Sequence, residues 1–232
     1  MDHPLVRAVR RELKRRANPE KAAPMRAYMK SAMPYLGVMT APQREVWREV
    51  FARHPLGDFE QWRQLVLLLW RDATFREERY GAIALIGRKE YASFRTMRAL
   101  PIYEEIVTTG AWWDFVDAVA TRSLRELLER YPRTVKPRML AWARSRNLWK
   151  QRAAILCQIG RKEATDLDLL YDCIRPAMHE REFFLRKGIG WALRDYAWTD
   201  PREVRRFVAE HADALSGLSR REALKNISGR RR

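Results

Sequence analysis

Helical periodicity runs along nearly the whole chain and limits the fold more than any other feature. Apolar residues recur at intervals of three and four, the period of an α-helix, and no convincing run alternates as a β-strand does. Glycines and prolines fall mostly between these segments. We therefore expect an all-α protein. The predicted helices span residues 4–16, 22–33, 42–53, 58–71, 76–89, 98–107, 113–130, 137–145, 149–161, 166–178, 182–196, 201–211 and 219–226.

Similar helix-bearing blocks recur in steps of 37, 36 and 35 residues. The segments 76–88 (REERYGAIALIGR) and 149–161 (WKQRAAILCQIGR) carry an arginine, an alanine-rich stretch and a final Ile-Gly-Arg in the same order. A repeat of this length is typical of antiparallel helix pairs stacked as an α-solenoid, with a concave face suited to a long ligand such as duplex nucleic acid. The blocks begin near Phe75, Trp112, Leu148 and Phe183.

The charge of the chain indicates a polyanionic partner. Its formal net charge is +17, and 37 of its 46 basic residues are arginine, whose planar guanidinium binds phosphate well. The hydrophobic fraction of 47% is nevertheless enough for a sizeable core. We expect one domain over residues 1–228, followed by a disordered basic tail at 229–232.

Several classes of protein are excluded at this point. The longest apolar run, residues 65–70, is far too short to cross a bilayer, and no secretory signal is present, so we expect a cytoplasmic protein. Cys157 and Cys173 lie in helical segments and are expected to be buried thiols. The four scattered histidines do not have the spacing of metal ligands, and we expect no metal.

Three segments combine aromatic and charged residues, and each opens the second half of a repeat. They are 112–117 (WWDFVD), 147–152 (NLWKQR) and 182–194 (EFFLRKGIGWALR). Trp113 and Asp117 are four residues apart and share one helix face. Each tryptophan alone could be a core anchor, and Asp117 with Arg152 could form an ordinary salt bridge. Together, however, they predict a basic groove with an acidic centre and aromatic walls.

These segments resemble the AlkD family of alkylpurine DNA glycosylases, and the matching motifs keep their order over most of the chain. Shorter matches around Tyr28 extend the resemblance towards the N-terminus. The motifs are RExRYxA (76–82), WWDxVD (112–117), LWxxRAAIL (148–156), KExTD (162–166), EFFxRKxIGWALRxY (182–196), TDP (199–201) and LSxLSRREALK (215–225).

The resemblance implies a HEAT-like α-solenoid with a concave basic DNA-binding cleft. It also implies an enzyme that excises N3- and N7-alkylated purines from duplex DNA, with the lesion still largely inside the duplex. No lysine lies in a context that indicates a lyase, so we expect a monofunctional glycosylase. We expect it to act as a monomer without a cofactor.

The resemblance also assigns site residues. Asp117 matches the catalytic carboxylate, Trp113 and Trp191 match aromatic cleft residues, and Arg152 matches a cleft arginine near the DNA backbone. The sequence departs from the commoner family pattern at Lys150-Gln151, where Leu-Arg is frequent, and at Gly188, where Ala is frequent. Further DNA contacts are expected from Tyr28, Arg194 and Arg44.

The residue types suit this chemistry. A purine alkylated at N3 or N7 is cationic and leaves as a neutral base, so the reaction needs an anion beside an oxocarbenium-like sugar more than a strong acid. Asp117 can supply that anion, and the faces of Trp113 and Trp191 favour a developing cation. Two alternatives remain: a non-catalytic HEAT-like module that binds nucleic acid, and a protein-binding scaffold, for which the charge is excessive.

Overall fold

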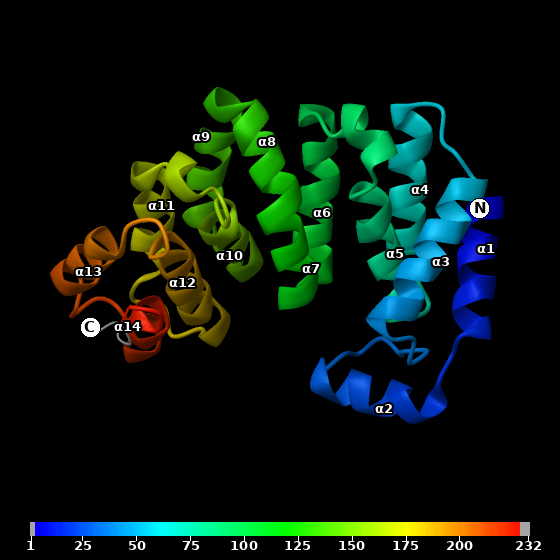
Figure 1. Cartoon of the computed structure of the whole chain (residues 1–232), viewed down its shortest axis with the longest axis horizontal. Helices are drawn as coiled ribbons and strands as arrows, with labels where there is room; N and C mark the ends of the chain where they lie inside the picture. The colour runs from blue at the N-terminus through cyan, green and yellow to red at the C-terminus, as the bar shows by residue number, and fades with distance from the viewer. Residues whose placement is uncertain (1–2, 228–232) are drawn as a thin grey trace. The chain divides into compact units, whose positions relative to one another are not determined.

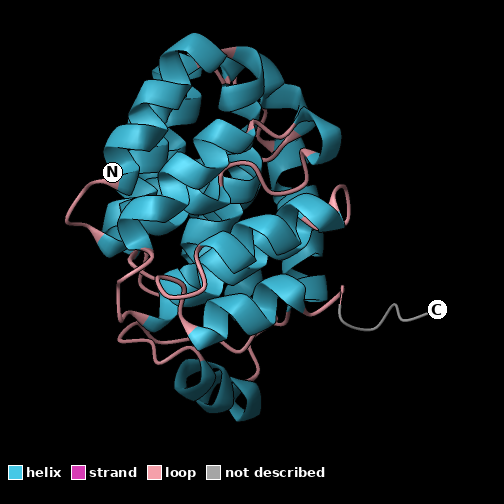
Figure 2. Cartoon of the chain, turned by 90° about the vertical axis from the view of Figure 1, so that its left-hand side faces the viewer, coloured by secondary structure: helices cyan, strands magenta, loops and turns pink. Residues whose placement is uncertain are grey.

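The computed structural model describes residues 3–227. That part of the chain consists of helices and connecting loops without a β-strand, which confirms the all-α prediction (Figure 2). It divides into two compact units, one up to residue 102 and the other from residue 103 onward. A single domain over residues 1–228 stays a prediction, and the tail at 229–232 lies outside the described residues. No helix of residues 3–227 is long and apolar enough to span a membrane.

The first unit is built around five α-helices. Helix α1 packs against α3, α4 and α5, and α5 also contacts α3 and α4. Phe51, Trp62 and Trp70 are almost completely buried between them, so this unit has a core of its own. The helices are α1 (Pro4–Arg15), α2 (Pro19–Tyr28), α3 (Thr40–Arg53), α4 (Phe59–Arg71) and α5 (Arg76–Ile86), followed by 3₁₀ turns at Lys89–Phe94 and Met97–Ala99.

The second unit continues from α6, whose first turn contains the boundary between the units. Three further short helical segments occur, a π-helical turn at Val119–Leu124 and 3₁₀ turns at Lys162–Ala164 and Arg175–Ala177. The α-helices are α6 (Leu100–Gly110), α7 (Trp113–Ala118), α8 (Arg125–Arg130), α9 (Pro132–Ala143), α10 (Leu148–Leu156), α11 (Leu167–Ile174), α12 (Phe183–Tyr196), α13 (Pro201–Glu210) and α14 (Gly217–Leu224).

Within the second unit, α7, α10, α12 and α14 pack one against the next, as Figure 1 shows. Helix α9 lies on α10 and α11, and α13 contacts α12 and α14. Helices α7, α10 and α12 begin within one residue of the predicted block starts, and so does α5 in the first unit. The predicted class of HEAT-like helical repeat is thereby confirmed. The concave basic cleft stays a prediction.

Side-chain caps explain why many helices begin where they do. The Asp200 carboxylate accepts hydrogen bonds from the backbone N–H groups of Arg202 and Glu203, and Pro201 occupies the first turn. These caps satisfy N–H groups that have no partner inside the helix. The other side-chain caps of α-helices are His3, Asn18, Asp58, Asn147, Asp166 and Ser216.

The predicted helix at 22–33 is wrong at both ends. Asn18 and Pro19 start α2 earlier, and the chain leaves the helix after Tyr28, with Lys30 at a φ of +47°. The following loop is held by the buried Glu77 carboxylate, which accepts hydrogen bonds from the backbone N–H groups of residues 36–38. Backbone capture by a distant carboxylate leaves no periodic signal in the sequence.

The predicted starts of α9 and α14 also differ from those of the structure. Helix α9 begins at Pro132, where a proline fits the first turn, and Pro137 lies inside the helix, where it cannot donate the usual hydrogen bond to the carbonyl four residues earlier. Helix α14 begins at Gly217 under a Ser216 cap, so Ser219 and Glu222 do not form a capping box. Both side chains instead bind α12, Ser219 Oγ through the Arg186 carbonyl.

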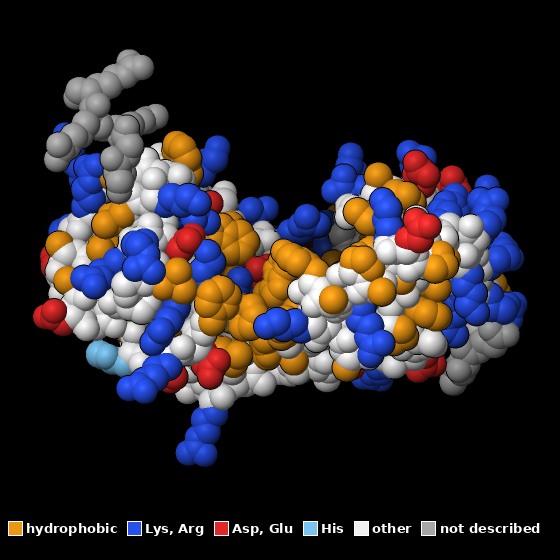
Figure 3. All heavy atoms as spheres, turned by 90° about the horizontal axis from the view of Figure 1, so that it is seen from below, with side chains coloured by type: hydrophobic (Ala, Val, Ile, Leu, Met, Phe, Trp, Pro, Cys, Tyr) orange, Lys and Arg blue, Asp and Glu red, His pale blue; other side chains and the backbone are white. Residues whose placement is uncertain are grey.

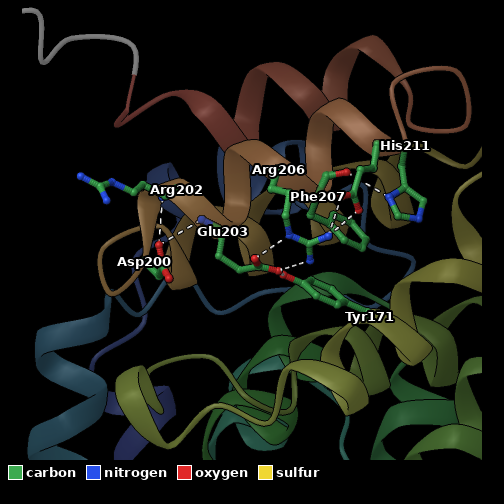
Figure 4. A network of polar contacts seen from close by, with 8 residues as sticks. Tyr171, Asp200, Arg202, Glu203, Arg206, Phe207 and His211 are labelled. Carbon is green, nitrogen blue, oxygen red and sulfur yellow. Dashed lines mark hydrogen bonds and ion pairs between the residues drawn. The ribbon is translucent and has the colours of Figure 1, made fainter.

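A polar network joins α11 to α13 (Figure 4). The Tyr171 hydroxyl donates to Glu203 Oε1 at 2.7 Å, and its ring stacks on Phe207 with centroids 4.0 Å apart. Hydrogen bonds from Arg206 and Tyr171 lower the pKa of Glu203 to about 2. This network fixes α13, which packs against the site-bearing α12.

Candidate active site

The predicted catalytic residues and the predicted DNA-binding Arg152 lie on three neighbouring helices of the second unit. Trp113 and Asp117 are on α7, Arg152 is on α10, and Trp191 is on α12. Because α10 contacts both α7 and α12, the fold brings together the three segments singled out in the sequence. Trp113 and Trp191 are half-buried, and each therefore keeps part of its surface accessible.

Asp117 and Arg152 form a bidentate ion pair. Arg152 Nε donates to Asp117 Oδ1 at 2.7 Å, and Nη2 donates to Oδ2 at 2.8 Å. The remaining nitrogen, Nη1, donates to the backbone carbonyl of Phe184 on α12. The arginine thus ties α7, α10 and α12 together through one planar group.

Burial and charge act in opposite directions on the Asp117 carboxyl. Its side chain is 14% exposed, and that of Arg152 only 6%. Desolvation raises the pKa of Asp117, Arg152 opposes this through its hydrogen bonds and charge, and the nearby Asp114 charge raises the pKa slightly further. Arg152 is therefore the group that favours the ionised form of this buried carboxyl.

An aromatic cluster supports the same three helices close to their N-termini. Trp112, Trp149 and Phe184 are in mutual contact, with ring centroids 5.1 to 6.1 Å apart. Phe184 supplies both this ring and the carbonyl that receives Arg152. Trp149 is buried and fits the core-anchor interpretation, whereas Trp112, Trp113 and Trp191 are each half-buried.

The helix that carries Asp117 changes its winding directly after it. Helix α7 continues without a break into the π-helical turn at Val119–Leu124 and then into α8. Thr121 Oγ1 donates to the Asp117 carbonyl at 2.8 Å across this turn. π-Helical turns within α-helices are frequent at functional sites because the extra residue redirects the side chains around it.

The structure gives Arg194 a carboxylate partner. Arg194 Nη1 donates to Glu222 Oε2 of α14, and Lys187 Nζ lies 2.9 Å from the other oxygen of the same carboxylate. The sequence analysis did not identify Glu222 as a partner of these cations. Contact between Arg194 and DNA stays a prediction.

The two remaining predicted residues lie in the first unit. Tyr28 ends α2 with 78% of its surface exposed, and Arg44 is exposed on α3. Lys and Arg side chains are also spread widely over the face of the molecule drawn in Figure 3. The assignment of Tyr28 and Arg44 to DNA contact stays a prediction.

Comparison with known proteins identifies the family. Residues 9–227 match the DNA alkylation repair enzyme family. The chain belongs to this family. A solved structure titled a predicted DNA alkylation repair enzyme from Enterococcus faecalis is similar over 92% of this chain and 98% of its own, with 29% identity and a TM-score of 0.82.

Two solved structures of lower sequence identity share the fold. AlkD2 from Streptococcus mutans is 18% identical with a TM-score of 0.59, covering 81% of this chain and 89% of its own. The Streptococcus mutans UA159 protein smu.31 is 19% identical with a TM-score of 0.58, covering 78% of this chain and 91% of its own. No curated protein sequence matches. The AlkD resemblance of the sequence is confirmed.

One of the two departures from the common family pattern lies beside the ion pair. A Cβ at position 188 would lie 3.1 Å from Arg152 Nη1, so Gly188 leaves room for the guanidinium. Lys150 binds Glu104, with Nζ 2.5 Å from Oε1, and lies over the Trp142 ring at 5.6 Å. The glycine therefore belongs to the Arg152 site, whereas Lys150 contributes to helix packing.

Other chemistry-bearing groups lie away from this arrangement. Cys157 and Cys173 are buried free thiols, as predicted, and burial raises the pKa of Cys157 to about 12. Among residues 3–227, no group of three His, Cys, Asp or Glu side chains could hold a metal ion. The groups of the candidate site that could take part in a reaction are thus an oriented carboxylate and half-buried indoles on adjacent helices.

Proposed function

We propose that this protein is a monofunctional DNA glycosylase that hydrolyses the N-glycosidic bond of cationic N3- and N7-alkylated purines in duplex DNA, without fully flipping the base. Its membership of the DNA alkylation repair family supports this proposal. The observation that carries it is the orientation of the Asp117 carboxylate by Arg152, one helical turn after Trp113 on α7. The enzyme would act as a monomer and without a cofactor.

In the proposed reaction, the bond between the sugar and the alkylated purine breaks first. The cationic purine departs as a neutral base, so the sugar acquires the positive charge. The anionic Asp117 stabilises that charge and orients a water molecule, which adds to the sugar carbon and loses a proton. Trp113 and Trp191 present indole faces to the developing cation. An unmodified purine carries no positive charge and would be a poor leaving group here.

Arg152 has a positioning role in this mechanism. Its bidentate contact restricts the Asp117 carboxylate to one orientation, and its charge opposes the rise in pKa caused by burial. The family resemblance assigns Arg152 a contact near the DNA backbone as well. Its donors to Asp117 and Phe184 would then be shared with, or exchanged for, a phosphate.

A non-catalytic DNA-binding module is the second candidate. It is favoured by the engagement of both Asp117 oxygens with Arg152, which is also the pattern of a structural ion pair. A purely structural pair would not explain half-buried tryptophans on the flanking helices. The two functions can be told apart by measuring whether the protein releases free base from alkylated DNA.

The test is release of free base from methylated duplex DNA by the purified protein, with and without a chelator. We expect N3-methyladenine and N7-methylguanine to be released, with chelator present, at a rate reduced by about 100-fold or more in Asp117→Asn. Asp168→Asn, an exposed carboxylate on α11, is the matched control and should behave as the parent. Tight duplex binding without base release would instead establish the non-catalytic module.

A further inference from the structure

Glu222 is the acidic residue that holds two cations of α12. Its Oε1 lies 2.9 Å from Lys187 Nζ, and its Oε2 accepts from Arg194 Nη1. One carboxylate thus occupies two basic side chains that are seven residues apart, two turns along the same helix face. The hydrogen bond from Lys187 is the main cause of the lowered pKa of Glu222, so the carboxylate is ionised at neutral pH.

The two cations flank a predicted site residue. Trp191 is four residues after Lys187 and three before Arg194, so all three side chains project from one side of α12. If Trp191 faces the DNA, Lys187 and Arg194 lie where backbone phosphates pass on either side of the lesion. Their side chains are 38% and 25% exposed, so both remain within reach of a ligand.

Helix α14 is built to place Glu222 at this position. A Cβ at position 190 would come within 2.4 Å of Glu222 Cβ, so Gly190 allows the two helices to approach closely. Ser219 Oγ fixes the register by donating to the Arg186 carbonyl at 3.0 Å. The close packing at Gly190 and the Ser219 hydrogen bond therefore hold α14 so that the Glu222 carboxylate lies against α12.

We propose that Glu222 is an internal competitor for DNA phosphate: its carboxylate occupies Lys187 and Arg194 in the free protein and so limits how tightly undamaged duplex DNA binds. The inference rests on the proposed function, because it takes α12 to face DNA. A phosphate reaching either cation must displace or share the carboxylate. The gain in DNA affinity from these two phosphate contacts is therefore reduced. A lower affinity helps an enzyme that must dissociate from undamaged DNA.

The experiment measures the affinity for undamaged duplex DNA between about 50 and 200 mM salt, a range over which phosphate contacts determine binding. Glu222→Gln retains the Cβ packing against Gly190 but removes the charge. We expect it to bind about threefold to tenfold more tightly, with a salt slope steeper by about 0.9, the contribution of one phosphate contact. Undamaged DNA should also inhibit its base release at lower concentrations.

Matched variants distinguish competition for Lys187 and Arg194 from the general effect of removing one negative charge. Glu210→Gln on α13 removes the same charge from a carboxylate paired with Arg206 and should change neither affinity nor slope. The gain from Glu222→Gln should disappear in a Lys187→Gln, Arg194→Gln background. If Glu222→Gln and Glu210→Gln bind alike, the competitor role is overturned.

If the Glu222→Gln variant does not fold, Glu222→Asp tests the competitor role. It keeps the charge but shortens the side chain, so it cannot span both cations, and we expect tighter binding by a smaller factor. Parental affinity and slope in this variant would overturn the proposal. These affinity measurements use undamaged DNA and do not depend on base release. A wild-type protein without activity would therefore contradict the proposed glycosylase function but not the competitor role of Glu222.

Discussion

At the scale of single residues, the ion pair between Asp117 and Arg152 makes activity dependent on pH. The mechanism requires ionised Asp117, so base release should rise as pH rises through the pKa of Asp117. Burial has already raised that pKa, and removal of Arg152 takes away the interactions that oppose the rise. Arg152→Gln should therefore shift the acid limb of the rate profile to higher pH and slow release at neutral pH by about tenfold or more.

Single-turnover base release measured across pH tests this assignment. Arg152→Lys keeps a charge but loses the bidentate geometry, so its limb should lie between those of the parent and Arg152→Gln. A slower reaction with an unmoved acid limb would mean that Arg152 acts on the DNA and not on the ionisation of Asp117.

Gly188 has a measurable role in the same pair. A methyl group there would lie 3.1 Å from Arg152 Nη1, and this guanidinium is fixed by Asp117 and by the Phe184 carbonyl. Gly188→Ala should displace the arginine by a few tenths of an ångström and slow base release by roughly threefold to tenfold. Gly87→Ala is the control, because its nearest neighbours would be carbonyl oxygens at 3.7 Å. Equal rates for both variants would show that Arg152 accommodates the methyl group.

At the scale of helices, the aromatic cluster should contribute more to stability than to chemistry. Phe184→Ala removes ring contacts with Trp112 and Trp149 while leaving the carbonyl that accepts from Arg152. We expect a loss of about 2 to 4 kcal/mol in the free energy of unfolding, measured by urea denaturation. Phe183→Ala on the same helix, 56% exposed, should cost far less. A similar loss for both variants would show that burial does not determine this contribution.

Helix identity was predictable from the sequence to a large extent, whereas helix ends were not. The repeat spacing located the starts of α5, α7, α10 and α12, because each repeat presents the same apolar face to its neighbours. The end of α2 depends on a loop held by the distant Glu77, which no local pattern reveals. Local capping chemistry was likewise ambiguous at Ser216 and Ser219, since either serine could cap the helix.

The site shows the same division. Trp113, Asp117, Arg152 and Trp191 were proposed as site residues because the repeat and the family motifs point to them. The structure places them on the neighbouring helices α7, α10 and α12, and their roles stay predictions. Phe184 was missed as a hydrogen-bond partner because it acts through its backbone carbonyl, which side-chain patterns do not report. The pairing of Glu222 with Lys187 and Arg194 was missed because it depends on how α14 packs on α12.

At the scale of the whole molecule, the charge of +17 should dominate DNA affinity. Each phosphate neutralised by a lysine or arginine releases condensed counterions, so the logarithm of the binding constant falls by about 0.9 per contact for each tenfold rise in salt. An arginine-rich protein that binds a duplex through many such contacts should show a slope of roughly −5 or steeper. Fluorescence anisotropy with an undamaged labelled duplex measures this slope directly.

The Asp117→Asn variant separates the contribution of the many phosphate contacts to DNA affinity from catalysis. It removes one anion without removing a cation, so its slope should match that of the parent while its affinity stays the same or rises slightly. Base release should be lost in the same preparation. A parental slope shallower than about −2 would mean that few of the arginines meet phosphate. The net charge would then serve solubility or another acidic partner, and the assignment of DNA as the main partner would fail.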